Sequence, residues 1–140
     1  MPKQKTLSII KPDAMQSNFS GNIITFLEEK GFNIVAQKKI KLTNSQAKLF
    51  YEVHKDRPFF SELVDFMISG PISVQILEAS DAVAFYRKVM GATNPDEAED
   101  DTIRKKYGKD IQCNAVHGSD SVENAKIEIA FFFSVLEISS

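Results

Sequence analysis

His117 is the residue whose type and surroundings most directly indicate chemistry, and it is one of two histidines in the chain. It follows a predicted strand over residues 111–116 and precedes Gly118 and a predicted helix, where Asp120 and Glu123 have the spacing of a capping box. Neutral imidazole presents a lone pair at pH 7, so a histidine can attack phosphorus without first losing a proton. The alternative is a histidine that only packs or caps, and this residue alone does not decide between the two.

The arginines are the first candidates for binding an anion beside such a histidine. The sequence contains neither Gly-x-x-x-x-Gly-Lys nor Gly-x-Gly-x-x-Gly, so phosphates would have to be bound by side chains. Arginine offers a permanently charged fork that fits phosphate oxygens. Only Arg57, Arg87 and Arg104 are present. Arg87 could instead interact with a helix dipole, and Arg104 could instead pair with Asp100 or Asp101.

Three further positions could complete a site. Lys11 ends a predicted strand just before a proline, which holds it extended as either a solvated lysine or a cation directed into a site. Thr93 lies in a turn-forming segment, where its hydroxyl could serve the turn or a ligand. Phe59 and Phe60 are adjacent on a predicted helix and point in different directions, so only one needs to be buried. An exposed ring there could stack on a base.

Glu128 borders the apolar face of the last predicted helix, an unusual position for a carboxylate without a partner. It is either a surface acid at the helix boundary or a group that holds one imidazole nitrogen and so fixes the tautomer. No Cys/His cluster has metal-ligand spacing, so no protein-held zinc is predicted. His54 lies near a helix end and is interpreted as structural or solvated.

The composition predicts one ordinary globular domain over residues 1–140. With 43% hydrophobic and 26% charged residues, a chain of this length can bury about 68% of its unfolded surface. A single cysteine, Cys113, excludes an intramolecular disulfide and suits a reducing compartment. The net charge of −2 gives no electrostatic support for binding nucleic acid. No signal peptide and no apolar span of membrane length is found, so we expect a cytoplasmic protein without a membrane contact.

Alternating strand and helix patterns predict the fold that must position these residues. Strands are predicted at 6–11, 32–42, 72–76 and 111–116, and helices at 20–30, 43–53, 59–69, 81–90 and 122–132. Ser20 and Asp81 are expected to cap helices, and Thr43 with Gln46 to form a capping box. Residues 92–110 are expected to be irregular and to include a solvated acidic loop at 96–101.

The element order becomes β-α-β-β-α-β when the central helical pair is treated as an insertion. This order predicts a ferredoxin-like α+β sandwich: a four-stranded antiparallel sheet with an inserted helical pair, a C-terminal helix, and helices covering one sheet face. Such folds host many functions, so the function must be inferred from the site.

Six short motifs in order resemble the nucleoside diphosphate kinase family, and the resemblance runs over nearly the whole chain. The His117 motif, Asn-x-x-His-Gly-Ser-Asp, is the most specific of them. The motifs are Ser8–Asp13, Arg57–Phe60, Met67–Pro71, Gly91–Pro95, Thr102–Arg104, and Asn114–Asp120 followed by Ser121-Val122-Glu123.

This resemblance implies a role for each matching residue. His117 is similar to the histidine that becomes phosphorylated, Glu128 to the carboxylate on its other nitrogen, and Ser119 to a nearby hydroxyl. Tyr51 resembles a tyrosine that supports the site. Lys11 resembles a residue that has both a catalytic and a nucleotide-binding role. The nucleotide contacts implied are Lys11 and Asn114 for the sugar, Lys11, Arg87, Thr93 and Arg104 for the phosphates, and Phe59, Leu63 and Ile111 for the base.

The resemblance also implies a reaction. The γ-phosphoryl group of a nucleoside triphosphate would pass to a nucleoside diphosphate by a ping-pong mechanism, with Mg2+ on the nucleotide phosphates and broad tolerance of the base. Such an enzyme maintains cellular NTP and dNTP pools. It implies a homo-oligomer, and the short tail after Phe133 favours a tetramer over a hexamer.

Two local features depart from a simple match. Asp100 and Asp101 stand where the family often has a Pro-Gly or Ala-Gly step, and they could pair with Arg104 in the empty enzyme. Asn114 and His117 have opposite parity on a regular strand, so both can face one pocket only if the strand ends or bulges between them. Cys113 is assigned no role.

Other functions remain open from the sequence. A nucleotide-sensing domain on the same fold would keep the stacking and phosphate-binding residues, but His117 with Glu128 argues against it. A histidine phosphorelay module is usually helical, which four predicted strands disfavour. An RNA-binding ferredoxin-like domain should show aromatic residues on its central strands and a positive charge, whereas these strands contain isoleucine and valine.

Overall fold

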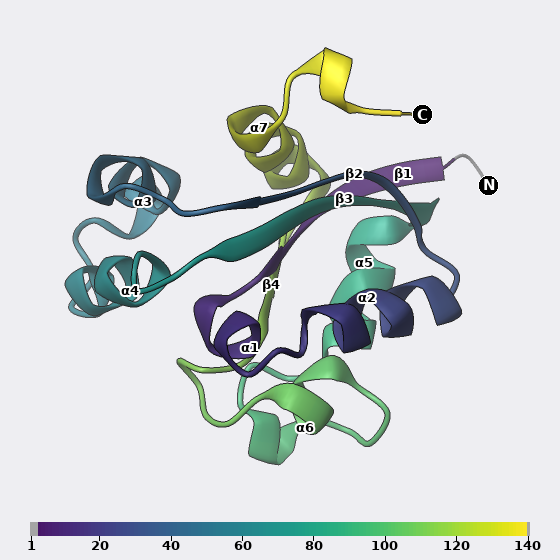
Figure 1. The fold of residues 1–140 in the computed structure, drawn as a ribbon, viewed down its shortest axis with the longest axis horizontal. Helices are drawn as coiled ribbons and strands as arrows, with labels where there is room; N and C mark the ends of the chain where they lie inside the picture. Colours follow the sequence, from purple (N-terminus) through teal and green to yellow (C-terminus); the bar gives the residue numbers. More distant parts are fainter. Residues whose placement is uncertain (1–2, 140) are drawn as a thin grey trace.

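A four-stranded antiparallel sheet forms the centre of the protein (Figure 1). The computed structural model describes residues 3–139. The spatial strand order is β2-β3-β1-β4, and the strands are β1 Lys3–Ile10, β2 Asn33–Ile40, β3 Ile72–Ser80 and β4 Val116–Gly118. This order and the antiparallel pairing confirm the predicted ferredoxin-like α+β fold.

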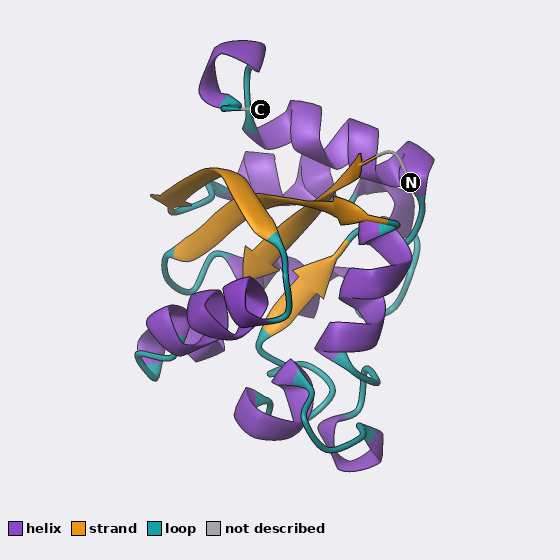
Figure 2. Ribbon diagram, turned by 90° about the vertical axis from the view of Figure 1, so that its right-hand side faces the viewer, coloured by secondary structure: helices purple, strands orange, loops and turns teal. Residues whose placement is uncertain are grey.

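Helices cover both faces of this sheet, which corrects the expectation of one covered face (Figure 2). The α-helices are α1 Pro12–Gln16, α2 Ser20–Glu29, α3 Asn44–Phe50, α4 Phe60–Met67, α5 Ala82–Met90, α6 Ile103–Tyr107 and α7 Val122–Phe132. One core cluster joins α3, α4 and α7 to the sheet, and the other joins α1, α2, α5 and α6 to it. Strand β3 is buried along Ile72–Glu78, as expected for a strand with helices on both sides. None of the described helices is both long and apolar enough to cross a membrane.

Strand β1 lies in the interior of the sheet and positions the histidine. It pairs with β3 along its whole length and with β4 over three residues, with Ile9 opposite His117. The predicted strand 111–116 is therefore wrong in its limits, because β4 begins at Val116 and includes His117. The preceding segment is irregular, and Ala115 has a φ of 73° that a strand cannot accommodate.

The helix ends agree with the sequence in part. Thr43 and Gln46 form the predicted capping box, with bonds of 2.9 and 3.1 Å. The cap of α7 is Ser121 instead of Asp120, since the Ser121 hydroxyl accepts from the Asn124 amide at 3.0 Å. Asp81 precedes α5 with a φ of 52° but forms no side-chain cap bond.

Three further boundaries differ from prediction. Ser20 is the first residue of α2 and does not cap it. Pro12 ends β1 as expected but also begins the short helix α1, which suits a proline at the first helical position. Helix α6 lies inside the region expected to be irregular, where the Thr102 side chain accepts from the Lys105 amide and caps it.

Candidate active site

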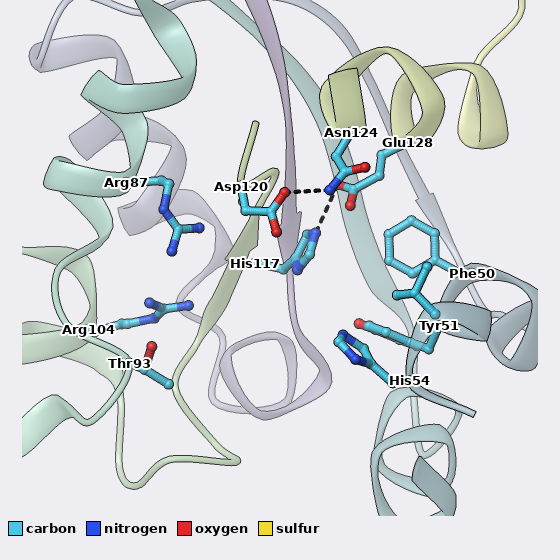
Figure 3. Close-up of a pocket in the computed structure, with 12 residues that line it drawn as sticks. Phe50, Tyr51, His54, Arg87, Thr93, Arg104, His117, Asp120, Asn124 and Glu128 are labelled. Atoms are coloured by element: carbon cyan, nitrogen blue, oxygen red, sulfur yellow. Dashed lines mark hydrogen bonds and ion pairs between the residues drawn. The ribbon is translucent and has the colours of Figure 1, made fainter. Parts of the chain in front are cut away.

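A polar cavity of about 280 Å3 opens beside β4. It lies between α5 and α6 on one side and α3 on the other, with α7 above His117 (Figure 3). Its lining residues are Phe50, Tyr51, Val53, His54, Arg87, Thr93, Arg104, His117, Gly118, Asp120, Asn124 and Glu128. The structure therefore brings together six predicted site residues: His117, Glu128, Tyr51, Arg87, Thr93 and Arg104.

His117 is held by a carboxylate on one nitrogen. Its Nε2 lies 3.0 Å from Glu128 Oε1, and the Ser119 hydroxyl donates to the same oxygen at 2.8 Å. The ring of Phe50 packs edge-on against the imidazole, with 5.6 Å between ring centroids. When Glu128 accepts from Nε2–H, the lone pair lies on Nδ1, which points away from Glu128 (Figure 3).

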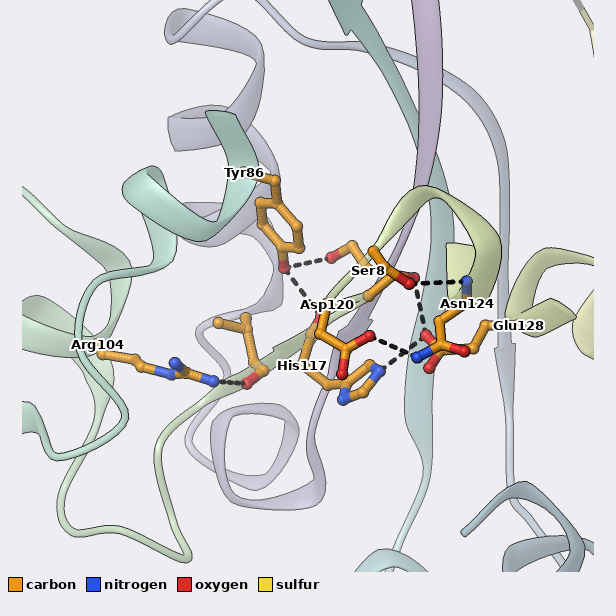
Figure 4. A network of polar contacts seen from close by, with 10 residues as sticks. Ser8, Tyr86, Arg104, His117, Asp120, Asn124 and Glu128 are labelled. Carbon is orange, nitrogen blue, oxygen red and sulfur yellow. Dashed lines mark hydrogen bonds and ion pairs between the residues drawn. The ribbon is translucent and has the colours of Figure 1, made fainter. Parts of the chain in front are cut away.

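A buried polar network fixes the backbone beneath His117 (Figure 4). The Tyr86 hydroxyl lies 3.2 Å from the His117 carbonyl oxygen and 2.6 Å from Ser8 Oγ. Gln75 donates to the same Ser8 hydroxyl at 2.8 Å. Burial raises the pKa of Tyr86, so the phenol stays protonated. None of Ser8, Gln75 and Tyr86 was predicted to support the site, although a glutamine inside the apolar strand β3 was a signal.

Two arginines lie across the cavity from the histidine ring (Figure 3). Arg104 is only 8% exposed, and its guanidinium donates to the carbonyls of Gly91 at 3.1 Å and Val116 at 2.9 Å. Burial lowers the pKa of Arg104, and the charge of Arg87 lowers it further. Within residues 3–139 no carboxylate pairs with either guanidinium. This arrangement suits a bound anion, since a buried charge without a counterion is unfavourable.

The expected pairing of Arg104 with Asp100 or Asp101 is wrong. Asp101 binds Lys30 at 2.5 Å and lies 3.8 Å from Lys106. The hydrogen bond and charge of Lys30 lower the pKa of Asp101. Asp101 thus pairs with neighbouring lysines on the surface, and Arg104 remains available to a ligand.

A second, more apolar cavity of about 450 Å3 shares Thr93 with the first. Its lining residues are Lys11, Phe59, Glu62, Leu63, Thr93, Ile111 and Gln112. Phe59 is 46% and Ile111 61% exposed, so both present apolar surface for a planar group. Phe60, the first residue of α4, instead packs against the core, so only one of the two rings is available to a ligand.

Lys11 and Asn114 meet at the edge of this second cavity. Lys11 Nζ donates to Asn114 Oδ1 at 2.8 Å and to the Gln112 carbonyl at 2.9 Å. Asn114 Nδ2 donates to the Thr93 carbonyl at 3.1 Å. Burial lowers the pKa of Lys11 to about 8. Asn114 and Ser119 are buried and do not line either cavity, but each holds a residue that does.

The structure adds residues that sequence reasoning did not place in the site. His54, interpreted as structural or solvated, lines the first cavity, with its ring centroid 5.5 Å from that of Phe59. Asp120 and Asn124 also line it, and Asn124 Nδ2 donates to Asp120 Oδ1 at 2.5 Å. Among residues 3–139, no three His, Cys, Asp or Glu side chains are grouped to hold a metal.

Comparisons with known proteins agree on one family. The model of the nucleoside diphosphate kinase family matches residues 4–138. A nucleoside diphosphate kinase of Persephonella marina is 56% identical over 138 residues, which are 99% of this chain and 99% of that protein. The solved structure of the Aquifex aeolicus nucleoside diphosphate kinase has a TM-score of 0.96 at 44% identity, covering 98% of this chain and 99% of that one. That of the halophilic enzyme from Halobacterium salinarum, in complex with CDP, has a TM-score of 0.94 at 38% identity, covering 99% and 93%.

Proposed function

The chain belongs to the nucleoside diphosphate kinase family and is an enzyme that transfers phosphoryl groups between nucleoside tri- and diphosphates, and we propose that the transfer proceeds in two steps through a phosphorylated His117. The observation that supports this most directly is the bond of 3.0 Å between His117 Nε2 and Glu128. It leaves the Nδ1 lone pair directed away from the carboxylate and into the cavity that holds both arginines.

In the first step, Nδ1 of His117 attacks the γ-phosphorus of a nucleoside triphosphate in line with the leaving diphosphate. The N–P bond forms as the bond to the β,γ-bridging oxygen breaks, and the diphosphate leaves with that electron pair. In the second step, a terminal oxygen of another nucleoside diphosphate takes the phosphoryl group and restores the free imidazole. Glu128 keeps the proton on Nε2 and stabilises the charge that develops on the ring.

Arg87, Arg104 and Thr93 stabilise the transferring group in this proposal. They line the first cavity together with His117, and Arg104 is preorganised by its two backbone carbonyl contacts. Fixed donors around the equatorial oxygens are the main catalytic contribution a protein makes to phosphoryl transfer. Mg2+ would offset further charge on the nucleotide phosphates. Asp120 lines the same cavity, and its carboxylate could contact that ion.

The two cavities match the two ends of a nucleotide. The base would stack on Phe59 beside Leu63 and Ile111, and the sugar hydroxyls would meet Lys11 and Asn114. Thr93 lines both cavities, so the phosphates would extend past it toward His117. Stacking without edge readout tolerates different bases, which suits a role in maintaining NTP and dNTP pools.

Trapping of the phosphoenzyme tests this proposal. The protein is mixed with Mg2+ and γ-labelled ATP, then chased with GDP. We expect acid-labile, base-stable label that is discharged into GTP. Label that forms but never moves to a diphosphate would instead favour a signalling phosphohistidine. Tight ATP binding without label would favour a nucleotide sensor.

The charge of Lys11 should make nucleotide capture depend on pH. Because its pKa is about 8, Lys11 is charged below that pH and neutral above it, and a neutral amine attracts phosphate less. We therefore expect kcat/KM for ATP, the substrate that reacts with the free enzyme, to fall roughly tenfold per unit well above pH 8. In Lys11→Gln this fall should disappear, and kcat/KM at pH 7 should already be low. A wild-type profile that stays flat to high pH would contradict the assignment.

Replacing Glu128 with glutamine should slow the first step. The glutamine amide can donate to Nε2 and thereby favour the tautomer that protonates Nδ1, so we expect kcat to fall about 10- to 100-fold with little change in KM. The rate of phosphoenzyme formation, measured by rapid quench, should fall equally. Glu123→Gln is the matched control, because Glu123 is exposed on the same helix. Equal quench rates for the two variants would rule out a positioning role for Glu128.

We propose in addition that the enzyme forms a homo-oligomer and that the tetramer is favoured over the hexamer. Membership of the family supports the homo-oligomer. Light scattering that showed a monomer would contradict this proposal.

A further inference from the structure

Ala115 has a backbone conformation that alanine rarely adopts. Its φ is 73° and its side chain is fully buried. The amide of Val116 donates to the carbonyl of Asn114 at 2.9 Å, which closes a three-residue turn around Ala115. A γ-turn with positive φ is rare and strained, so surrounding contacts must hold it.

This turn explains how two site residues face one site. On a regular strand, Asn114 and His117 would point to opposite faces, because they are an odd number of positions apart. The turn lies between them, just before β4 begins at Val116. It brings the Asn114 amide to Lys11 Nζ at 2.8 Å, while His117 enters the first cavity.

The segment that follows β1 holds both polar groups of Ala115. Asp13 Oδ2 accepts from the Ala115 amide at 3.1 Å, and the Lys11 amide donates to the Ala115 carbonyl at 2.8 Å. Asp13 is only 8% exposed, and its Oδ1 has no hydrogen-bond partner within residues 3–139. A buried carboxylate is costly unless partners stabilise it, and Asp13 has the charge of Lys11 nearby and one hydrogen bond, from the Ala115 amide. Its contact is to the strained residue between Asn114 and His117.

We propose that Asp13 is a positioning residue of the active site, which holds the turn at Ala115 and thereby aligns the Asn114 amide with the sugar hydroxyls while His117 reaches the phosphorus. This inference rests on the proposed function, since it requires that Asn114 and Lys11 meet the sugar. Asp13 does not touch the nucleotide; it acts through the Ala115 amide. Loss of the contact should therefore impair sugar recognition more than it impairs phosphate binding.

The test compares ADP with 3′-deoxyADP as phosphoryl acceptors from GTP. Wild type should prefer ADP about 10- to 100-fold in kcat/KM, the value of a hydrogen bond to a charged group. In Asp13→Ala the preference should shrink at least about fivefold, since the Asn114 amide is no longer held. Asp13→Asn keeps an acceptor oxygen at the same distance and should retain the preference within about twofold.

Two further variants keep the test decisive. Asp13→Glu keeps the charge but displaces it by one methylene, so it should also reduce the preference, and it serves if Asp13→Ala does not fold. Asp65→Ala is the control, because Asp65 is exposed on α4 and lines neither cavity. An unchanged preference in Asp13→Ala or Asp13→Glu, with both substrates slowed equally, would overturn the proposal and leave Asp13 a structural residue. Failure of the proposed function would differ, since wild type would then transfer to neither acceptor.

Discussion

Replacing His117 with alanine is expected to lower kcat by at least about 10^4-fold, because it removes the atom that forms the covalent bond to phosphorus. No other side chain of the first cavity combines a free nitrogen lone pair with a fixed position on a strand. His54 also lines the cavity, but it lies on the short turn Glu52–His54 and has no carboxylate partner among residues 3–139. It should not replace the lost nucleophile.

Nucleotide binding provides the control for this variant. The contacts proposed for the base, sugar and phosphates come from Phe59, Lys11, Asn114 and the two arginines, and none depends on the imidazole. His117→Ala should therefore bind ADP within about threefold of wild type by calorimetry, since ground-state contacts are kept. Steady-state turnover and label trapping measure the loss of chemistry. A variant that still forms acid-labile, base-stable label would show that another residue is phosphorylated.

Replacing Gly91 with alanine should lower the free energy of unfolding more than any other substitution proposed for this protein. Gly91 has a φ of 89°, which disfavours any side chain. An added Cβ would lie 2.6 Å from Thr102 Oγ1 and 2.8 Å from Thr102 Cβ. Thr102 cannot easily move, because its hydroxyl donates to the Glu99 carbonyl at 2.7 Å. Strain and overpacking together should destabilise the protein by about 2–5 kcal/mol.

The same substitution should affect the site, since the Gly91 carbonyl accepts from Arg104 at 3.1 Å. Any shift of this backbone would move the guanidinium that faces His117. Calorimetry should show Tm lowered by roughly 10 °C, and kcat should fall even well below the new Tm. Gly21→Ala is the matched control: a Cβ there meets nothing within 4 Å, and Gly21 lies in α2, where alanine should be neutral or stabilising. Equal Tm values for the two variants would contradict this account.

The sequence alone determined the elements whose local chemistry is strong. Alternation of apolar residues predicted β1, β2 and β3, and Thr43 with Gln46 predicted a capping box that the structure contains. The motifs around His117 and Lys11 were specific enough to indicate the family, which the family model over residues 4–138 confirms. In each case the signal is local, because the residues that form a cap or a strand pattern are close in the chain.

The tertiary structure decided the details that depend on distant partners. The limits of β4 follow from its pairing with β1 and from Asp13, which holds the Ala115 amide from about a hundred positions away. Arg104 faces the cavity because two backbone carbonyls bind its guanidinium, and because Asp101 pairs with Lys30 instead of with Arg104. The second covered face of the sheet likewise arises from α3, α4 and α7 packing together. Each of these features forms where long-range contacts override the local conformational preference of the sequence, and those contacts exist only in the packed tertiary structure.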